Sequence, residues 1–322
     1  MDRENYNTSH PDFLLLGLST RPEQERFLFV TFLVLYLLNM TGNLLIIFLI
    51  RSDARLLHAP MYFFLSHLSF VDVCFTSTTI PKMLHNLRTG CKNIAFTNCM
   101  IQMYFFLAFA ITENFLLGAM ALDRFMAICL PLRYPVLMKP LQCHIMVFVA
   151  WLLAHLHALL HTVLMSRLSF CDHHEIPHFF CDFQPLVVMA CSNKSLSEML
   201  SFFEGGTIII GNFILILVSY IRIVQVVLRV PSGQGRSKAF QTCVSHLIAV
   251  TLFYSSAIGV YFWPHSSYSG DKDKVAIVMY TVVTPMLNPF IYSLRNADMK
   301  AALHRALDKL RNALQKSQTI NS

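Results

Sequence analysis

Seven apolar stretches, each long enough to cross a lipid bilayer as a helix, dominate this sequence. A transmembrane helix needs about 20 mainly apolar residues to cross about 30 Å of hydrocarbon. Transmembrane barrel strands are only about 10 residues long and alternate in polarity, a pattern that this sequence lacks. We therefore expect an all-α membrane protein, a bundle of seven transmembrane helices. The stretches are residues 27–50, 60–83, 96–122, 144–168, 200–228, 244–263 and 275–294.

The composition agrees with a membrane protein. Of the 322 residues, 55% are hydrophobic and only 13% are charged, against about 25% charged residues in soluble domains. The polar N-terminal segment lacks the basic start and short apolar core of a cleavable signal. We expect a glycosylated extracellular tail at 1–26, one seven-helix membrane domain at 27–294, and a cytoplasmic helix and tail at 295–322.

Charge on the connecting segments predicts which end faces the cytoplasm. Basic residues accumulate on cytoplasmic loops of membrane proteins, and here they accumulate on alternate connections. The predicted inner segments hold Arg51, Arg55, Arg124, Arg133, Lys139, Arg229, Arg236 and Lys238, with six more basic residues after position 294. The loop 169–199 is acidic instead. We therefore expect an extracellular N-terminus, and we attribute the net charge of +7 to orientation, with no nucleic acid as partner.

Two further marks agree with this orientation. Asn7 and Asn193 lie in glycosylation sequences, both on the predicted outer side. Cysteines that can form disulfides are also on that side, where such bonds persist. They are Cys99, Cys171, Cys181 and Cys191, with Cys91 as a fifth outer thiol of no assigned partner. Four cysteines allow three pairings, and the sequence alone does not choose among them.

Polar residues at mid-membrane depth are candidate functional residues. Asn43, Asp72, Glu113 and Asn288 fall in the first, second, third and seventh stretches. Buried carboxylates are costly in a membrane and generally indicate function. Two close carboxylates do not both ionise without a cation or a shared proton. A cation or proton site and a plain hydrogen-bond network both remain open as interpretations.

Several motifs, in order along the chain, identify a family. They are LHAPMYFFLS at 57–66, MALDRFMAIC at 120–129, Ser219-Tyr220, KAFQTCVSHL at 238–247 and PMLNPFIYSLRN at 285–296. Together they resemble the tetrapod olfactory receptors, which are rhodopsin-like (class A) G-protein-coupled receptors. The sequence departs from the family pattern at Phe125, where Tyr is usual, and at Leu122 and Gln241.

The resemblance implies a function and its partners. It implies an odorant receptor that binds a small, mostly hydrophobic volatile ligand and activates a stimulatory olfactory-type heterotrimeric G protein, raising cyclic AMP. Residence in the plasma membrane of sensory cilia is implied as well. No cofactor and no enzymatic activity are expected. It further pairs Cys99 with Cys181 and Cys171 with Cys191, so that the long outer loop covers the bundle.

The resemblance also assigns a switch at the cytoplasmic side. Arg124 would be held locally in the inactive state and would face the inserted G-protein helix in the active state. A topology-setting charge at a helix end is the simpler interpretation of the same residue. The predicted switch residues are Asp123, Arg124, Tyr220, His246, Asn288, Pro289 and Tyr292. Pro289 removes an amide donor and thus bends the seventh helix, although such bends also serve packing.

A ligand pocket is expected in the outer halves of helices three, five, six and seven. Its composition, apolar and aromatic with a few polar groups, is typical of small-molecule sites. Mapped from the family motifs, its lining would be Phe106, Leu107, Ala110, Ile111, Glu204, Gly205, Ile208, Tyr254, Ala257, Ile258, Tyr261, Val278 and Thr281. Glu204 would select a hydrogen-bond donor or an amine. Ordinary helix packing explains any single apolar member equally well.

Histidines give only weak signals of ligand or metal binding. His157 and His161 lie one turn apart in the fourth stretch, within reach of the expected ligand pocket, but membrane histidines are more often satisfied within the bundle. The pattern of His178, Cys181 and Asp182 resembles a metal motif suggested for such receptors, but a disulfide at Cys181 removes its thiolate. We therefore predict no metal site.

The region after the seventh stretch has helical periodicity. Met299, Leu303, Leu307, Leu310 and Leu314 form an apolar stripe, with basic residues largely elsewhere. This pattern predicts an amphipathic helix on the inner leaflet.

Other classes fit less well. A retinal-based pump needs a lysine inside the seventh helix, and Lys274 is at its outer edge. A transporter would show inverted repeats, and an enzyme would show a constellation of nucleophile and base or of metal ligands. Neither pattern is legible in this sequence. The serious alternative is a non-olfactory class A receptor for a small endogenous lipid or metabolite.

Overall fold

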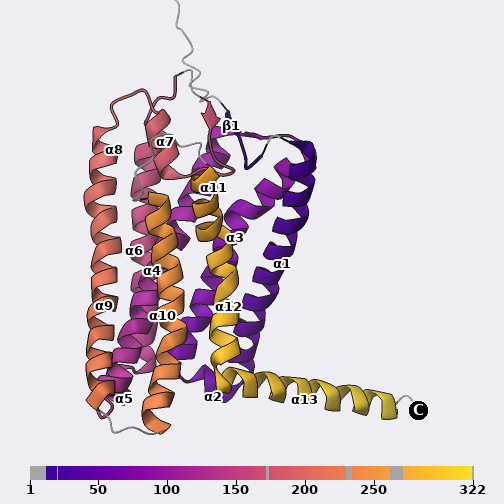
Figure 1. Cartoon of the computed structure of the whole chain (residues 1–322), viewed down its shortest axis with the longest axis vertical. Helices are drawn as coiled ribbons and strands as arrows, with labels where there is room; N and C mark the ends of the chain where they lie inside the picture. Colours follow the sequence, from indigo (N-terminus) through magenta and orange to yellow (C-terminus); the bar gives the residue numbers. More distant parts are fainter. Residues whose placement is uncertain (1–11, 20, 172–173, 230–233, 262–270, 321–322) are drawn as a thin grey trace, which may run out of the picture.

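The computed structural model describes residues 12–19, 21–171, 174–229, 234–261 and 271–320, with side chains except at 234–242, 271–273, 293–295, 310, 313–314 and 316–320. In this part of the chain, seven helices are long and apolar enough to cross a membrane, as predicted. They stand side by side as an upright bundle (Figure 1). Asn7 lies outside the described residues.

The long helices begin and end where the local sequence dictates. They are α1 (Pro22–Ser52), α3 (Pro60–Thr89), α4 (Phe96–Cys129), α6 (Pro140–Ser166), α9 (Gly206–Arg229), α10 (Gln234–Tyr261) and the pair α11 (Asp271–Val278) and α12 (Thr284–Arg295). Proline occupies the first turn of α1, α3 and α6, where its missing amide costs no hydrogen bond. Gly90 ends α3 with a φ of 72°, a conformation that favours glycine.

Two long spans contain a π-helical turn. η1 (Ser201–Gly205) joins the short α8 (Ser195–Leu200) to α9, and η2 (Met279–Val283) joins α11 to α12. Such turns shift the register of the side chains that follow and are frequent at functional sites. Each one contains a residue that the sequence assigns to the ligand pocket, Glu204 in η1 and Thr281 in η2.

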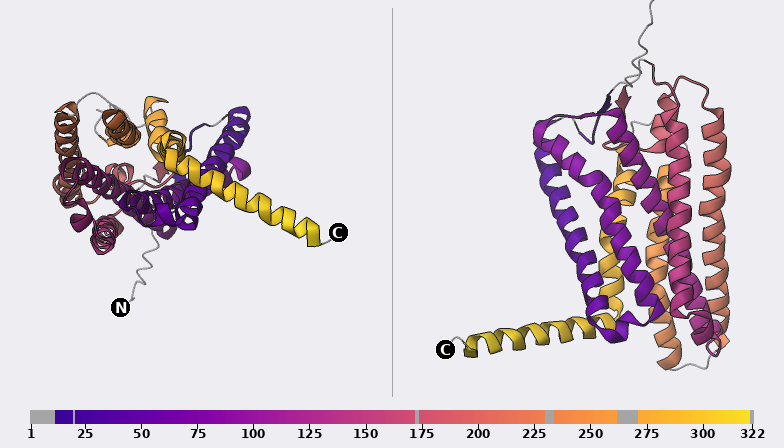
Figure 2. Two further views of the ribbon diagram at one scale, coloured as in Figure 1. Left: turned by 90° about the horizontal axis from the view of Figure 1, so that it is seen from below. Right: turned by 180° about the vertical axis from the view of Figure 1, so that it is seen from behind.

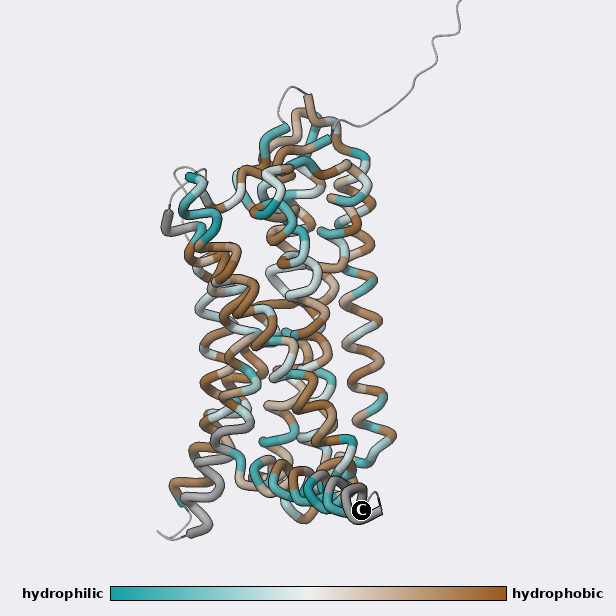
Figure 3. The backbone as a smooth tube through the Cα atoms, turned by 90° about the vertical axis from the view of Figure 1, so that its right-hand side faces the viewer, coloured by the Kyte–Doolittle hydropathy of each residue, from teal (hydrophilic) through white to brown (hydrophobic). Residues whose placement is uncertain are grey.

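α4 is the central helix of the bundle. Within its most apolar window 72% of the residues are buried, against 28% for α1 and 22% for the span that contains α9. α4 packs against α3, α6 and α9. Figure 3 shows apolar residues along the shafts of the helices and polar ones toward their ends. The exposed leucines and phenylalanines of α1 and α9 are therefore membrane-facing.

A small sheet and both predicted disulfides mark one end of the bundle, here named the disulfide end. β1 (Phe13–Leu15) pairs antiparallel with β2 (Asn93–Ile94) and parallel with β3 (Glu175–Ile176). Cys99 is bonded to Cys181 and Cys171 to Cys191, which confirms the pairing implied by the resemblance. Cys91 is an exposed free thiol. The sheet was not predicted, because strands of two or three residues leave no readable alternation.

The loop between α6 and α8, described at residues 167–171 and 174–194, covers the disulfide end and carries α7 (Phe183–Met189). Its Phe179 and Phe180 are buried in the main apolar core of the bundle. The backbone amide of Cys181 donates to Oε1 of Gln102 on α4 at 2.9 Å. The loop is therefore packed into the bundle as well as bonded to it.

The opposite end, here named the α13 end, carries α2 (Ala54–Leu57), α5 (Tyr134–Leu137) and α13 (Ala297–Ile320). α13 turns away from the bundle and extends to one side of it (Figure 2). Met299 is buried against the bundle, Leu303 is partly buried and Leu307 is exposed. The predicted helix is present; the side chains of Leu310 and Leu314 lie outside the described residues.

Candidate functional site

A cluster of polar side chains occupies the middle of the bundle. Nδ2 of Asn288 on α12 donates to Oδ2 of Asp72 on α3 at 3.0 Å and is within hydrogen-bonding reach of Glu113 on α4. All three residues are buried. Oδ1 of Asp72, Oε1 of Glu113 and Oδ1 of Asn288 have no hydrogen-bond partner among the described residues. Three buried oxygens without donors form an environment that suits a cation or a proton.

Asn43, predicted as a residue of the polar core, makes a specific contact with α12. Pro289 has no amide hydrogen, so the carbonyl of Pro285, one turn earlier, loses its helical donor. Nδ2 of Asn43 on α1 lies 3.4 Å from that carbonyl oxygen and donates to it. A Cβ at Gly42 would lie 3.0 Å from Cβ of Pro289. A glycine and an asparagine on α1 therefore accommodate the proline of α12.

A second polar group links α4, α9 and α10. Tyr254 donates through its hydroxyl to Oδ1 of Asn114 at 2.7 Å. Nδ2 of Asn212 donates to the carbonyl of Asn114 at 2.6 Å and to the Tyr254 hydroxyl at 3.1 Å. A Cβ at Gly118 would overlap the amide of Asn212. Asn114, Asn212 and Gly118 were not predicted, since a single Asn or Gly in an apolar stretch carries no pattern.

Aromatic rings fill the space between this group and the loop 167–194. Phe106 of α4 contacts Phe180 of the loop, with ring centroids 4.7 Å apart. Phe106 also lies 4.9 Å from Phe75 of α3, and Tyr280 of η2 contacts both rings edge-on. Tyr280 further contacts Tyr261 of α10 at 6.0 Å. The aromatic cluster thus joins four helices beneath the loop.

Asp182 of the loop is buried beside this aromatic cluster. Its Oδ1 accepts from the backbone amide of Phe183 at 2.7 Å, and the Tyr261 hydroxyl donates to its Oδ2 at 3.3 Å. Burial raises the pKa of the Asp182 carboxyl from 3.8 to about 6, against the opposing effect of these two donors. Asp182 was singled out only as part of a weak metal pattern.

Near the α13 end, Tyr220 of α9 and His246 of α10 form a pair. The Tyr220 hydroxyl lies 2.8 Å from Nδ1 of His246, and Nε2 of His246 lies 3.0 Å from the carbonyl of Leu117 on α4. Because a carbonyl only accepts, the hydrogen is on Nε2, and Tyr220 donates to Nδ1. The pair ties α4, α9 and α10 together. The buried Tyr292 hydroxyl has no partner among the described residues.

The two charges at the end of α4 are separated in their contacts. Oδ1 of Asp123 accepts a hydrogen bond from the Tyr134 hydroxyl of α5 at 2.8 Å. Arg124 is only partly buried, and no carboxylate of a described residue lies within 4.0 Å of its guanidinium. The neighbouring Asp123 is therefore a nearby charge and not an ion-pair partner of Arg124 in this structure.

α13 is attached to the bundle by polar contacts. The Tyr62 hydroxyl of α3 lies 3.0 Å from both Oδ1 of Asn296 and Oδ2 of Asp298. Arg305 of α13 donates through Nε to Oδ2 of Asp53 at 2.7 Å. This ion pair lowers the pKa of Asp53 below its ordinary value, with the Arg305 hydrogen bond as the largest cause.

Comparison with known proteins identifies the family. The olfactory receptor family model matches residues 32–309. Olfactory receptor 1L6 of Homo sapiens is 54% identical over 310 residues, which is 96% of this chain and 89% of that receptor. Olfactory receptor 1L4 of Homo sapiens is 53% identical over 98% of this chain and 99% of that receptor. Olfactory receptor 1E5 of Pan troglodytes is 53% identical over 95% of this chain and 97% of that receptor.

The chain belongs to the olfactory receptor family. It is a multi-pass membrane receptor and not an enzyme. Membership implies an odorant as ligand and coupling to a G protein, and it favours this family over the non-olfactory class A alternative.

The structure brings most of the predicted pocket residues of this olfactory receptor toward the bundle interior. Those that are buried are Phe106, Ala110, Ile111, Tyr254, Ala257 and Thr281. Those that are partly buried are Leu107, Glu204, Gly205, Ile208, Tyr261 and Val278. Ile258 differs. It is 50% exposed and shares a helical face with the exposed Thr251 and Ser255, so it points away from the bundle.

The predicted role of Glu204 changes with its contacts. Its Oε1 lies 2.8 Å from Nδ1 of His157, and its Oε2 lies 2.9 Å from Nε2 of His161. Both carboxylate oxygens therefore already have partners on α6. The sequence treated Glu204 and the two histidines separately, because nothing in it places them together.

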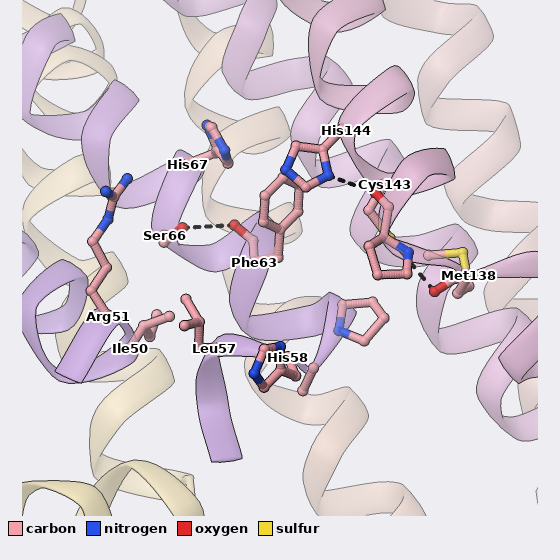
Figure 4. Close-up of a pocket in the computed structure, with 13 residues that line it drawn as sticks. Ile50, Arg51, Leu57, His58, Phe63, Ser66, His67, Met138, Cys143 and His144 are labelled. Atoms are coloured by element: carbon pink, nitrogen blue, oxygen red, sulfur yellow. Dashed lines mark hydrogen bonds between the residues drawn. The ribbon is translucent and has the colours of Figure 1, made fainter. Parts of the chain in front are cut away.

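A pocket of about 530 Å³ lies at the α13 end of the olfactory receptor, between α1, α3 and α6 (Figure 4). It contains Arg51 and three histidines, and no acidic residue lines it. The His144 ring lies against Phe63, with centroids 4.7 Å apart. This pocket lies at the opposite end of the bundle from the predicted odorant pocket, and the two share no lining residue.

Proposed function

We propose that this receptor binds a small, mostly hydrophobic volatile odorant near the disulfide end and activates a stimulatory olfactory-type G protein at the α13 end, raising cyclic AMP. The disulfide end would then be extracellular and the α13 end cytoplasmic. The observation that carries the proposal is that α10 holds residues of both regions. Tyr254 belongs to the predicted pocket lining. His246 lies two turns away on the same helix and pairs with Tyr220.

The chemistry of the predicted lining supports a neutral apolar ligand. Its buried members are mostly aliphatic or aromatic, and their polar groups are few, namely the hydroxyls of Tyr254 and Thr281. Thr281 donates to the carbonyl of Ile277 of its own helix at 2.8 Å. Because Glu204 is occupied by histidines, an amine anchor there is not favoured. Apolar contact would supply most of the affinity.

The coupling between the two regions follows from the hydrogen bonds of α10. A ligand that displaces Tyr254 disturbs its bonds to Asn114 and Asn212 and shifts α10 against α4 and α9. The same helix then carries His246 away from Tyr220 and from the carbonyl of Leu117. The Tyr220 and Tyr292 hydroxyls become available to the region around Arg124, which would then receive the G protein. A ligand acts in this way only if it binds the shifted state more tightly.

A matched pair of variants on α10 tests the pocket. Ala257 is buried and Ile258, its neighbour, is half exposed. In a cyclic AMP screen with a chemically diverse odorant panel, Ala257→Phe should abolish the response or change which odorants elicit it. Ile258→Phe should leave the response within about twofold, since it adds volume only on the outside. Equal responses of both variants, at equal surface expression, would exclude the pocket as placed.

The cluster of Asp72, Glu113 and Asn288 is proposed as a cation or proton site that biases the receptor between its states. Three orphaned buried oxygens support it, because a bound cation would give each of them a partner and a shared proton would give a partner to two of them. If the site is occupied in only one of the two receptor states, signalling depends on sodium concentration or pH.

Orientation and location are testable together. We propose a plasma membrane receptor of sensory cilia with an extracellular N-terminus, glycosylated at Asn7 and Asn193. Asn193 is exposed at the disulfide end. An epitope tag at the N-terminus should be stained on intact cells, and a C-terminal tag only after permeabilisation. The reverse pattern would contradict the orientation. We place α13 on the inner leaflet, with its apolar side toward the lipid.

A further inference from the structure

Three potential metal ligands converge between α6 and η1. His157 and His161 lie four residues apart, so they share one face of α6. Both are buried, and Glu204 reaches them from η1. Its two oxygens lie 2.8 Å from Nδ1 of His157 and 2.9 Å from Nε2 of His161. The two imidazole rings are themselves close, with centroids 4.4 Å apart.

The spacing of the three ligand atoms suits a divalent cation. They all lie within 4.8 Å of one another. Zinc binds imidazole nitrogen at about 2.0–2.1 Å and carboxylate oxygen at about 2.0–2.2 Å in tetrahedral geometry, which places neighbouring ligand atoms about 3.3 Å apart. The two N···O contacts of 2.8 and 2.9 Å join the histidines to different oxygens of Glu204. They need to open by about half an ångström, and ligand atoms up to 4.8 Å apart need to close by up to about 1.5 Å, to reach that spacing.

The surroundings hold the histidines in place and leave room at Glu204. The ring of Phe183 on α7 packs edge-on against His161 at 4.9 Å. Gly205 lies beside His157, because a Cβ there would be 3.8 Å from Cε1 of that ring. The Glu204 side chain is 33% exposed, whereas the two histidine side chains are only 6% and 2% exposed. An ion can therefore enter past Glu204 and meet preformed imidazole ligands.

The ligand set also favours a metal over a simple hydrogen-bonded triad. Two histidines at i and i+4 on one helix with a carboxylate are a recurrent zinc ligand set. Three protein ligands leave a fourth position for water or for a donor atom of a bound molecule.

We propose that His157, His161 and Glu204 form a binding site for a late first-row divalent cation, with zinc as the preferred ion. The bound cation would join α6 to η1. Glu204 belongs to the predicted pocket lining, so an ion here presents its open position to that region. The proposal concerns metal binding and is read without signalling, so its failure and that of the odorant proposal are distinguishable.

The test uses the full-length receptor, purified in detergent through a tag that contains no histidine. Zinc binding is measured by calorimetric titration, and cobalt is added in place of zinc to record its visible absorption. We expect a saturable zinc site and the intense cobalt spectrum of tetrahedral coordination, abolished by competing zinc. A cobalt spectrum typical of the hydrated ion, together with no saturable zinc binding, would overturn the proposal.

Variants locate the site. His157→Gln and His161→Gln keep side-chain size and hydrogen bonding but remove an imidazole. Each should weaken zinc binding at least about tenfold, because even the loss of an outer-shell partner of a ligand costs about 10–100-fold. His155→Gln is the matched control, because His155 is on the same helix but bonds to the Tyr104 hydroxyl at 2.8 Å. Unchanged zinc affinity in the His157→Gln/His161→Gln double variant would place the ion elsewhere and refute the site. If that double variant does not fold, Glu204→Gln decides in the same way.

Discussion

The two ends of the bundle are held together by different kinds of interaction. At the disulfide end, two covalent bonds, a three-stranded sheet and a separate apolar cluster fix the loop 167–194. At the α13 end, single polar contacts predominate, such as Tyr220 with His246 and Tyr134 with Asp123. Covalent and apolar contacts resist rearrangement, whereas single hydrogen bonds exchange partners at small cost. A ligand-driven change of shape is therefore expected at the α13 end.

Breaking the disulfide that closes the longer loop should have the largest effect. Cys99 and Cys181 are 82 residues apart, and Cys171 and Cys191 are 20 apart. A disulfide typically contributes about 2–4 kcal/mol, more for longer loops. Cys99→Ser should abolish surface delivery, measured by staining of an N-terminal tag, and Cys171→Ser should reduce it less. Cys91→Ser removes a free exposed thiol and is the control. Normal delivery of Cys99→Ser would show that the disulfide end does not depend on this bond.

Gly118→Ala should have the next largest effect, because the added methyl overlaps the amide of Asn212. Overpacking of this kind costs about 1–3 kcal/mol. The variant should show a lower melting temperature and a weaker odorant response. Gly211→Ala is the control, since nothing lies within 4 Å of a Cβ there, and it should be neutral or slightly stabilising. Adding Asn212→Ala to Gly118→Ala should recover part of the lost stability; no recovery would exclude this overlap as the cause.

Glu113→Gln should change signalling without loss of folding. It removes one of the two carboxylates of the central cluster while keeping the shape of the side chain. Odorant-driven cyclic AMP should lose its dependence on external sodium or on pH. Glu198→Gln, at an exposed position near the disulfide end, should retain the parental behaviour. If neither dependence changes in Glu113→Gln, the central cluster is a plain hydrogen-bond network.

Asp182→Asn should have the smallest effect, visible as a change in how stability depends on pH. Burial raises the pKa of this carboxyl from 3.8 to about 6. Between these values the folded receptor holds a proton that the unfolded chain has released, so stability falls as pH rises from about 4 to about 6 and stays lower above it. Asp182 is the N-cap of α7, and Asn cannot ionise but is an equally good N-cap.

The purified Asp182→Asn variant should therefore melt at a higher temperature than the parent at pH 7.5, and the difference should shrink as the pH falls toward 4. Asp12→Asn, at an exposed position at the same end, should show no such trend. A constant difference at all pH values would mean that the carboxyl does not titrate in this window.

The fold was predictable because length and apolar composition alone specify membrane helices. The central cluster was predictable as a set, since polar residues in apolar stretches stand out. Asn114 and Asn212 were missed because each is a single amide whose partners lie on other helices. The convergence of Glu204 with His157 and His161 was missed for the same reason. Ile258 was assigned to the pocket from motif spacing alone. Spacing does not show which side of α10 a residue occupies, and here Ala257 faces inward while its neighbour Ile258 faces outward.

The most direct test of the account is nucleotide exchange on the G protein after neutralisation of Arg124. Arg124→Gln removes the charge and keeps a similar length, and Arg51→Gln removes an exposed charge at the same end. With equal surface expression and an identified odorant, we expect Arg124→Gln to lose odorant-driven exchange and Arg51→Gln to keep it. Exchange at the parental rate in Arg124→Gln would contradict the assignment of the α13 end as the switching end.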